Sequence, residues 1–417
     1  MIYIFTSIAA NYLPKARVLA KSLKKFHPEF KLYLVIDKIP EWFELKSEPF
    51  DDFILYQDLN IPNFKSWIFK YSLLEMCTAV KPYVFLHLFQ NDPSAVLYFD
   101  PDIVVFSRLD DLIEYFNEFS ILLTPHQTEP ETIHDAIIDN EICSLNYGIF
   151  NLGFIGVKND SEGKKFAHWW ADRLDRFCYA ELNKGLWVDQ KWINLVPCFF
   201  EKIKIIRSPR FNVAPWNLTT RKLYGNFEKG FFVDDKPLGF YHFTGFDSKA
   251  HEIMVLKYAG DNEAVKELIK WYKLQIKDDK AANLPFAYAH YQNFENGEPI
   301  QLVHRIIYRM RRDLQEIYSD PFKVIPNGKC FYNWFKWRAH IEHPDIIKNY
   351  LSKASNEIET KTTFIKDLEI IIKRIYRSCK KSIRDKNYRK YLYNKIKYII
   401  KTEGIKGLVK EIFSNNK

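Results

Sequence analysis

Residues 96–106 read Val-Leu-Tyr-Phe-Asp-Pro-Asp-Ile-Val-Val-Phe, an apolar run that two carboxylates interrupt before it resumes. The run predicts a buried strand that ends at Asp100, because Pro101 cannot donate to an interior strand ladder. In extended backbone, residues two apart project to the same side, so Asp100 and Asp102 are expected to converge. Converging carboxylates suit a divalent cation such as magnesium or manganese, shared with a substrate diphosphate. The structural alternative is a strand-ending turn with solvated acids.

Strand and helix patterns alternate over roughly the first 250 residues, which predicts an α/β layered fold. The predicted strands are 2–5, 32–36, 96–99, 121–123 and 150–157, and the predicted helices begin at Pro14 and cover 69–80. From about Lys257 the pattern becomes helical, most clearly over 264–274 and 300–318. Ligands of open α/β sheets bind beyond the carboxyl ends of the strands. Thr6, Asp37 and the Asp100/Asp102 pair fall at such ends, so one crevice is expected to collect them.

Length and composition narrow the class of protein. A chain of 417 residues suggests two or three domains, and contents of 47% hydrophobic and 17% aromatic residues exclude a disordered chain. No segment approaches the roughly 18 uninterrupted apolar residues of a membrane span. The chain starts with a predicted strand, which argues against a signal peptide. Its six cysteines lack C-x-x-C spacing, so reduced thiols in a cytoplasmic protein are expected.

The net charge of +9 is concentrated at one end of the chain. Residues 361–417 contain 17 Lys and Arg against 5 Asp and Glu, a net +12. Ile and Tyr residues interleave with these cations at roughly helical spacing. Such a segment can lie on an anionic membrane surface, with the cations at the headgroups and the rings below them. A solvated helical hairpin packed on the body and a nucleic-acid-binding arm are the alternatives.

Five motifs resemble a known family because of the order in which they occur. They are Thr6 through Asn11-Tyr12, Tyr-Phe-Asp-Pro-Asp at 98–102, Tyr-Gly-Ile-Phe-Asn-Leu-Gly-Phe at 147–154, Val-Asp-Gln at 188–190 and Tyr-His-Phe-Thr-Gly at 241–245. Over residues 1–250 this order resembles GT-A glycosyltransferases, most closely the retaining family eight group with glycogenin and bacterial lipopolysaccharide sugar transferases. A likeness to less described bacterial proteins continues to about residue 345.

The resemblance, the helical pattern after it and the charge of the last residues together predict a three-part chain. Residues 1–255 would form the GT-A domain, a Rossmann-like domain that binds nucleotide sugars. Residues 256–345 would form a mostly helical accessory region, and residues 346–417 a basic amphipathic helical tail.

The resemblance also implies a metal site for manganese or magnesium. Its ligands would be Asp100, Asp102 and His242, and Gly245 would let backbone N–H groups approach the phosphates. A satisfied core histidine is the alternative for His242. The chain departs from the family just after this motif, because Ser248 stands where a phosphate-binding Lys is usual. This puts phosphate contact by the next residue, Lys249, in doubt.

Nucleotide contacts are implied for the loop after the first strand. Thr6, Asn11 and Tyr12 occupy positions that resemble the family's base- and ribose-binding segment, and Asn11 and Tyr12 can hydrogen-bond to and stack on uracil. Capping and packing roles are the alternatives for these residues. Lys70 corresponds loosely to a basic residue aimed at the nucleotide or sugar, although a solvated helix lysine would have the same sequence signal.

Catalytic contacts are implied for Asn151, Asp189 and Gln190. In the retaining relatives the Asp-Gln pair lies on the reacting face of the donor sugar, so Asp189 would orient the acceptor or stabilise positive charge at the anomeric carbon. A strand-ending role for Asn151 and a helix cap for Asp189 are the alternatives. Lys81 has no role that the sequence defines, and His126 and Trp216 are weaker candidates.

The expected function is a metal-dependent glycosyltransferase. It would move a sugar from a UDP-sugar to a surface-glycan, lipid-linked or protein acceptor, in the cytoplasm or at the inner membrane face. The alternative of another class is a nucleic-acid- or membrane-binding scaffold in which Asp100 and Asp102 are structural. A nucleotidyltransferase is disfavoured because the Thr6–Tyr12 segment lacks a glycine-rich loop, and no nucleic-acid partner is expected.

Overall fold

The computed structural model describes residues 1–278, 284 and 289–352. It divides into two compact units, Met1–Lys336 and Trp337–Lys417, and of the second only residues 337–352 are described. The basic segment 361–417 and its expected membrane contact lie outside the described residues. The domain boundaries expected at 255 and 345 stay predictions.

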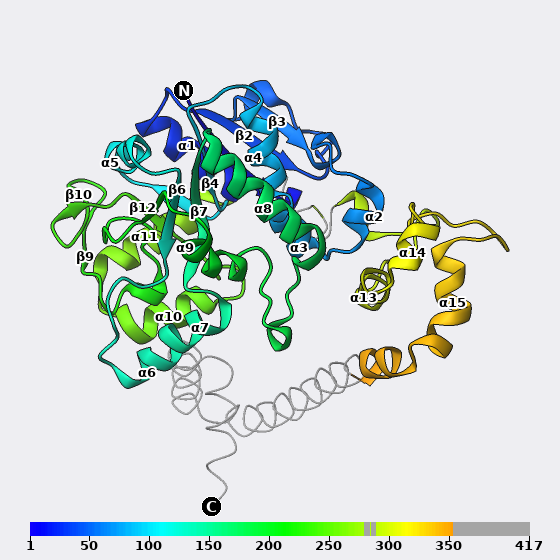
Figure 1. The fold of residues 1–417 in the computed structure, drawn as a ribbon. Helices are drawn as coiled ribbons and strands as arrows, with labels where there is room; N and C mark the ends of the chain where they lie inside the picture. Colours follow the sequence, from blue (N-terminus) through cyan, green and yellow to red (C-terminus); the bar gives the residue numbers. More distant parts are fainter. Residues whose placement is uncertain (279–283, 285–288, 353–417) are drawn as a thin grey trace, which may run out of the picture. The chain divides into compact units, whose positions relative to one another are not determined.

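A seven-stranded sheet forms the centre of the first unit, in the order β3-β2-β1-β4-β7-β6-β8 (Figure 1). The strands are β1 (Ile2–Ile8), β2 (Lys31–Ile36), β3 (Asp52–Leu55), β4 (Ala95–Phe99), β6 (Ile121–Pro125), β7 (Phe150–Lys158) and β8 (Ile203–Ile205). Strands β3, β2, β1 and β4 are mutually parallel, whereas β7 is antiparallel to both its neighbours, β4 and β6. The predicted α/β fold class is confirmed.

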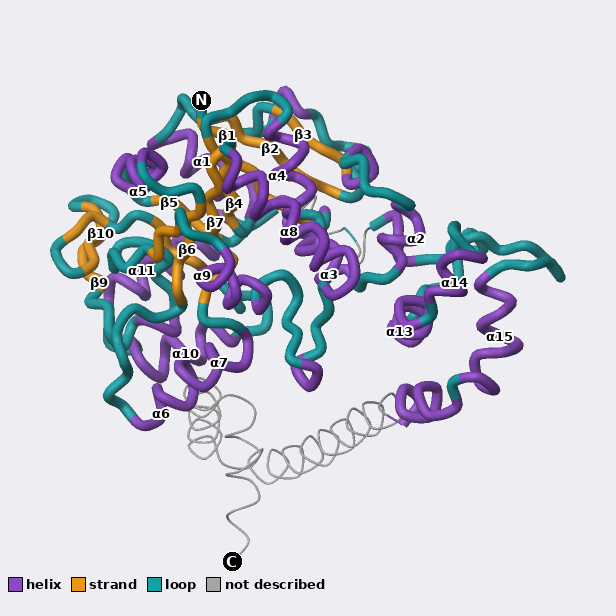
Figure 2. Tube along the Cα trace, in the orientation of Figure 1, coloured by secondary structure: helices purple, strands orange, loops and turns teal. Residues whose placement is uncertain are grey.

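Helices of the first unit connect and cover these strands (Figure 2). They are α1 (Leu13–Phe26), α2 (Phe64–Phe69), α3 (Leu73–Ala79), α4 (Lys81–Phe89), α5 (Asp110–Glu114), α6 (His134–Ala136), α7 (Cys143–Tyr147), α8 (Ser161–Phe177) and α9 (Val196–Phe199). Pro14 stands in the first turn of α1, where its missing N–H costs nothing. The helix predicted over 69–80 is confirmed as α3, but it begins at Leu73 and ends at Ala79. Here α2 ends at Phe69, and Ser72 caps a separate helix α3 through a capping box with Glu75.

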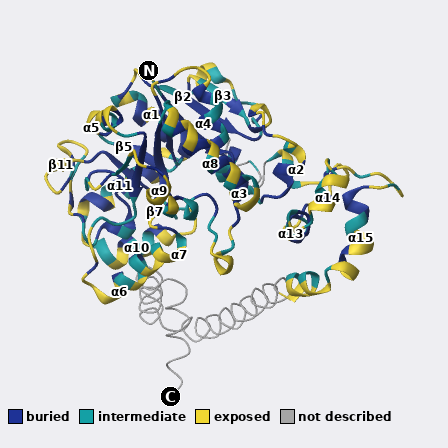
Figure 3. Cartoon of the chain, in the orientation of Figure 1, coloured by how far each residue is buried: buried dark blue, intermediate teal, exposed yellow. Residues whose placement is uncertain are grey.

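Different helices cover the two faces of the sheet. Ile4 of β1 shares a core cluster with Leu19 of α1, whereas the next residue, Phe5, packs on Phe85 of α4 with ring centroids 5.0 Å apart. Trp170 of α8 continues this second layer, 6.3 Å from Phe85. Successive strand residues point to opposite faces, so α1 covers one face while α4 and α8 cover the other. Figure 3 shows the strands as the buried layer between them.

The chain changes sheets directly after β4. Strand β5 (Ile103–Val105) pairs antiparallel with β12 (Phe240–His242) in a separate two-stranded sheet, with Ile103 opposite His242. This pairing brings the motif at 241–245 next to Asp100 and Asp102, although about 140 residues separate them in sequence. A three-stranded sheet of β9 (Leu223–Asn226), β10 (Gly230–Val233) and β11 (Lys236–Pro237) lies between β8 and β12 in the chain.

The later part of the first unit is helical, as predicted. Helices α10 (Ala250–Ala259), α11 (Glu263–Gln275), α13 (Leu302–Met310) and α14 (Arg312–Ile317) follow, and α15 (Phe331–Glu342) begins in the first unit and ends in the second. The helix predicted over 264–274 is confirmed as α11. The single helix predicted over 300–318 is wrong, because Arg311 adopts extended backbone (φ −111°, ψ 94°) and separates α13 from α14.

The helices before residue 337 dock on the sheet domain through buried contacts. Arg305 of α13, with 2% of its surface exposed, donates to the carbonyl oxygens of Phe69 and Tyr291. The ring of Phe69 meets Tyr308 and Phe322, each at 5.0 Å between centroids. These contacts fix α2, and therefore the start of α3, from outside the sheet. In the described part of the chain, no helix combines the length and apolarity that crossing a membrane requires.

Candidate metal and nucleotide-sugar site

Asp100, Pro101 and Asp102 form the turn between β4 and β5. The Ile103 N–H donates to the Asp100 carbonyl oxygen at 3.0 Å, so the segment is not the extended chain that was expected. The expected reason for convergence is therefore wrong. The turn is held from both sides, because the Asp100 N–H donates to Gly153 of β7 (2.7 Å) and the Asp102 carbonyl accepts from the Phe243 N–H (2.8 Å).

The side chains of Asp100, Asp102 and His242 nevertheless meet. Their ligand atoms all lie within 4.8 Å of one another. His242 Nε2 is 3.1 Å from Asp102 Oδ1 and 3.7 Å from Asp100 Oδ2. Two carboxylates and one imidazole nitrogen are a donor set that suits manganese, and magnesium when waters or phosphates complete its shell. The residues therefore fit the divalent cation expected from the sequence.

Burial and charge act in opposite directions on this cluster. Burial of His242 lowers the pKa of its ring, but the Asp102 carboxylate raises it, and the net pKa lies above the usual value. Burial raises the pKa of Asp102, but the His242 ring lowers it, with a net decrease. Without a bound cation, the pair therefore favours a carboxylate facing an imidazolium. A cation placed between the three side chains would supply the same positive charge.

Asn151 of β7 orients the ring of His242 through a contact with its Nδ1 atom. Its Oδ1 accepts from the Gly153 N–H (3.1 Å) and from the Asn212 amide (3.2 Å), which fixes which end of the Asn151 amide faces the ring. His242 Nδ1 lies 3.2 Å from the same oxygen. The ring therefore donates from Nδ1 and directs Nε2 toward the two acids. This is the arrangement in which an outer partner sets the tautomer of a metal-binding histidine.

Lys81 is a central residue that the sequence left without a role. It stands in the first turn of α4, its side chain is 2% exposed, and its Nζ lies 2.8 Å from Asp189 Oδ2 and 3.9 Å from Asp100 Oδ1. The Nζ also lies 4.0 Å from the centroid of the Tyr98 ring. Burial raises the pKa of Asp189 despite the nearby Lys81 cation. A lysine in the first turn of a largely apolar helix indicates a buried charge, but it does not identify the partner of that charge.

A cavity of about 720 Å³ lies beside the cluster. Of the predicted site residues, Asp100, Asn151, Asp189, Gln190, His242 and Gly245 line it, together with Lys81, His126, Trp187 and Trp216. Gln190 holds the wall of this cavity in place, because its side chain accepts from the Leu152 N–H (3.1 Å) and donates to the Tyr147 carbonyl (3.0 Å). Gly245 has φ +69°, a left-handed backbone that favours glycine.

The predicted base-binding residues lie along and after β1. Thr6 is inside this strand, which runs on to Ile8, so the prediction that Thr6 ends the strand is wrong. The Tyr12 hydroxyl donates to Asp247 Oδ2 at 2.8 Å, and Lys15 Nζ donates to the same oxygen at 2.6 Å. Burial and the Asp247 carboxylate raise the pKa of Tyr12. These contacts tie the loop after β1 to the loop after Gly245, and the nucleotide roles of Thr6, Asn11 and Tyr12 stay predictions.

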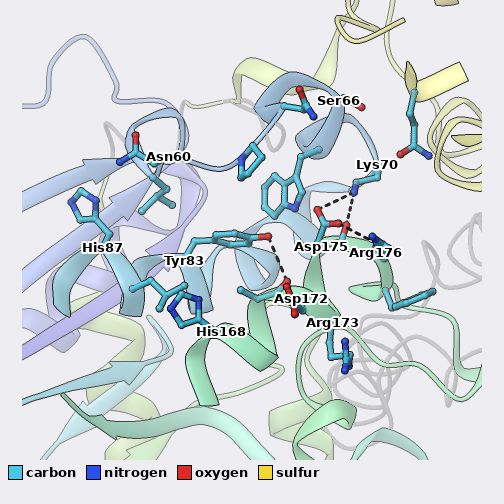
Figure 4. Close-up of a pocket in the computed structure, with 18 of the residues that line it drawn as sticks. Asn60, Ser66, Lys70, Tyr83, His87, His168, Asp172, Arg173, Asp175 and Arg176 are labelled. Carbon is cyan, nitrogen blue, oxygen red and sulfur yellow. Dashed lines mark hydrogen bonds and ion pairs between the residues drawn. The ribbon is translucent and has the colours of Figure 1, made fainter. Parts of the chain in front are cut away.

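Lys70 lies in a different place, a second cavity of about 1120 Å³ (Figure 4). Its Nζ donates to the carbonyl oxygen of Asp175 and lies 3.5 Å from the carboxylate of the same residue. Burial lowers the pKa of Lys70. Tyr83, His87 and His168 share this cavity (Figure 4), whereas the lining around Asp100 does not include Lys70. Nucleotide contact by Lys70 therefore stays a prediction, and the geometry lends it no support.

No protein-family model matches the sequence. Two proteins of Bacillus subtilis strain 168 are similar to it. The uncharacterized protein YfnD is 24% identical over 281 residues, which are 65% of this chain and 88% of that protein. The uncharacterized protein YfnF is 25% identical over 174 residues, 41% of this chain and 57% of that protein.

Three solved structures of glycosyltransferases are also similar. The galactosyltransferase LgtC, in complex with donor and acceptor sugar analogues, is 16% identical with a TM-score of 0.35, covering 65% of this chain and 100% of LgtC. GlyE of Streptococcus pneumoniae TIGR4 is 16% identical (TM-score 0.37; 66% and 64% covered). Mouse xyloside xylosyltransferase 1 is 13% identical (TM-score 0.36; 58% and 97% covered). These structural neighbours are glycosyltransferases.

Proposed function

We propose that this chain is a metal-dependent glycosyltransferase that moves a sugar from a UDP-sugar donor to a glycan, lipid-linked or protein acceptor, with retention of configuration. The observation that carries the proposal is the convergence of Asp100, Asp102 and His242 within 4.8 Å at the carboxyl end of β4. A cavity of about 720 Å³ beside them offers space for a sugar. Ligand sites at the carboxyl ends of strands are the rule in open α/β sheets.

The chain's own residues divide the work around the donor. Asp100, Asp102 and His242 would hold a divalent cation, which would neutralise the charge that the leaving diphosphate gains. The backbone at Gly245 would present N–H groups to phosphate oxygens. Asp189, held by Lys81 at 2.8 Å, would face the sugar carbon that gains positive charge as its bond to phosphate breaks.

The same arrangement supports the proposal of retention. Asp189 is engaged in a buried ion pair with Lys81, which favours an electrostatic role over a covalent nucleophile. Attack on the face from which the phosphate departs, with that phosphate as the base, needs no further carboxylate. An inverting enzyme would need a carboxylate base on the opposite face of the sugar.

The scaffold alternative makes a different demand on the site. A structural Asp100-Pro101-Asp102 turn would need neither a cavity beside it nor the buried Lys81–Asp189 pair. Both features lie next to the acids, which supports an enzyme over a scaffold.

Metal-dependent donor turnover is the direct test. A panel of nucleotide sugars is incubated with the full chain and manganese, and release of the nucleoside diphosphate is measured. We expect Asp102→Asn to reduce turnover about 100-fold or more, because it removes a charge that stabilises the leaving diphosphate. The exposed Asp261→Asn variant is the matched control and should behave as the original chain. Full turnover in excess chelator would refute the proposal.

The base preference is tested by binding alone. Asn11 and Tyr12 favour uracil, and the segment around them has no glycine-rich phosphate loop. Calorimetric titration with UDP and GDP, each with manganese, should show tighter binding of UDP. Equal or tighter binding of GDP would contradict the choice of donor while leaving the metal-dependent reaction open to the turnover assay.

A further inference from the structure

The loop that carries Asp189 is closed at its base. Residues 178–189 leave the end of α8 and return beside it, where the Val188 N–H donates to the Tyr179 carbonyl oxygen at 3.0 Å. Tyr179 and Val188 are both buried, whereas Asn183 and Lys184 between them are exposed. The orientation of Asp189 therefore depends on what holds this base.

Val188, directly before Asp189, has a strained backbone. Its φ is +39°, and only 5% of the residue is exposed. A β-branched residue rarely adopts positive φ, because Cβ and its branches crowd the backbone. Such a conformation persists where the surrounding structure fixes it, and it concentrates at functional sites. The next residue is Asp189, whose Oδ2 lies 2.8 Å from Lys81 Nζ.

Arg309 of α13, in the helical region, contacts the same loop. Its guanidinium carbon lies 3.9 Å from the centroid of the Tyr179 ring. It pairs with the carboxylate of Glu181 in the loop and, at 3.5 Å, with Glu75 of α3. The side chains of Arg309 and Glu75 are each 4% exposed, so water screens this pair little.

Glu75 connects the two sides of the candidate site. Its Oε1 accepts from the Ala180 N–H of the loop (2.9 Å), and its Oε2 accepts from the Ser72 N–H that starts α3 (2.8 Å). Helix α3 leads directly into α4, whose first residue is Lys81. Arg309 therefore holds both segments. It contacts the helix before Lys81 through Glu75, and it contacts the loop before Asp189 through the ring of Tyr179.

We propose that Arg309 is a positioning residue: it clamps residues 178–189 so that Val188 stays in the left-handed conformation that aims Asp189 at Lys81. This rests on the proposed function for its effect on turnover, but the clamp itself is a structural claim. It gives the helical region a task in the reaction, because a residue far along the chain sets the geometry of a side chain at the donor sugar.

A rescue experiment tests the clamp. Arg309→Met keeps the length of the side chain and removes its charge, and we expect kcat for donor turnover to fall roughly 10-fold or more, as for a misplaced catalytic group. Affinity for UDP with manganese should change less than about twofold, because Arg309 contacts Tyr179, Glu181 and Glu75 and none of the candidate metal ligands. Arg312→Met, an exposed arginine of α14, is the matched control and should leave both unchanged.

Val188 supplies the decisive comparison. Val188→Gly and Val188→Ala both remove the buried methyl branches, but only glycine also lacks Cβ and adopts positive φ without strain. In the Arg309→Met background, Val188→Gly should recover several-fold in kcat, and Val188→Ala should not. Equal behaviour of the two variants in that background would overturn the proposal, because relief of strain would then have no part in the effect.

Hydrogen exchange separates this proposal from the proposed function. Arg309→Met should speed exchange of the Ala180 and Val188 amides, whether or not any donor is turned over. Unchanged exchange and unchanged kcat would refute the clamp. Turnover that is absent from the original chain, together with faster exchange in the variant, would refute the proposed function and support the clamp.

Discussion

Asn151 has a role toward His242 that the sequence does not predict. The sequence predicted an amide that touches the sugar, and the structure gives its Oδ1 to the Gly153 N–H, the Asn212 amide and His242 Nδ1. With that oxygen occupied on three sides, the amide sets the tautomer of the histidine. A contact with the sugar through the remaining Nδ2, which lies 3.3 Å from His126 Nε2, stays a prediction.

Asn151→Leu should therefore weaken metal binding. Loss of an outer partner of a metal-binding histidine costs about 10- to 100-fold in metal affinity. Manganese affinity is measured by calorimetry without nucleotide, and Asn296→Leu in an exposed turn serves as the control. A normal manganese affinity combined with a raised KM for the donor would instead favour the sugar-contact role.

Asp37 is a buried acid whose ionisation should appear in the stability of the protein. It accepts from the His290 N–H at 2.9 Å, and burial raises its pKa from 3.8 to about 7. The folded state thus keeps a proton that the unfolded chain releases near pH 4. The stability from this proton is fully present below about pH 4 and is lost as the pH rises to about 7.

The Asp37→Asn variant cannot ionise and should escape this loss. The quantity to compare is the unfolding free energy of the variant minus that of the original chain. We expect this difference to rise by roughly 2–4 kcal/mol from about pH 4.5 to about pH 8. Urea unfolding of both proteins at the two pH values gives the difference, in which the other titrating groups cancel. A difference that is the same at both pH values would show that Asp37 is ionised in the folded state throughout.

The sequence predicted which three candidate ligands would meet, but it did not predict the geometry that brings them together. Asp100, Asp102 and His242 could be named because acids at a strand end and a histidine in a fixed order of motifs are local signals. The pairing of Lys81 with Asp189 could not be named, because it depends on where α4 and the loop after α8 meet in space. Ion pairs between distant segments leave no mark in the spacing of either one.

At the scale of elements, apolar patterns located β1, β2, β4, β6 and β7 of the central sheet, but they missed its edge strands β3 and β8 and the breaks between helices. Strand β4 is a continuous apolar run, and β7 is one over residues 152–157, and such runs are distinctive in sequence. The breaks at 70–72 and at Arg311 come from capping and docking, since Ser72 and Glu75 form a capping box and Arg311 has extended backbone. A helical period continues across such breaks, so periodicity alone predicts one helix where two exist.

Phe69 should carry much of the docking of the helical region. Its ring is fully buried and meets Phe294, Tyr308, Phe322 and Phe331 at 5.0–6.0 Å. Removing such a side chain costs about 3–5 kcal/mol. Phe69→Ala should therefore lower the free energy of unfolding by this amount, measured in urea, and expose residues 289–336 to limited proteolysis.

Phe227→Ala provides the control, because that ring is 44% exposed and should cost much less. The Asp100, Asp102 and His242 cluster lies in the sheet domain, so we expect Phe69→Ala to keep its manganese affinity. Loss of manganese binding in a variant that still unfolds cooperatively would contradict this separation of docking from metal binding.

At the scale of the whole molecule, the charge and the candidate chemistry lie in different parts of the chain. Residues before 361 carry a net −3, and residues 361–417 carry +12. The metal cluster and the cavity beside it belong to the first unit. The charge of this segment predicts a role in locating the protein at a surface of opposite charge.

The last prediction concerns that segment. Each basic residue near an anionic surface contributes about 1 kcal/mol, and salt screens the attraction over about 10 Å at 0.1 M. The full chain should therefore sediment with vesicles of anionic lipid at low salt and be released at high salt, whereas zwitterionic vesicles should not retain it. A chain ending at residue 360 should stay in the supernatant and keep its donor turnover, because the metal ligands are all present. Failure of the full chain to bind anionic vesicles at low salt would contradict the membrane role, and retention on RNA under the same conditions would favour the nucleic-acid arm.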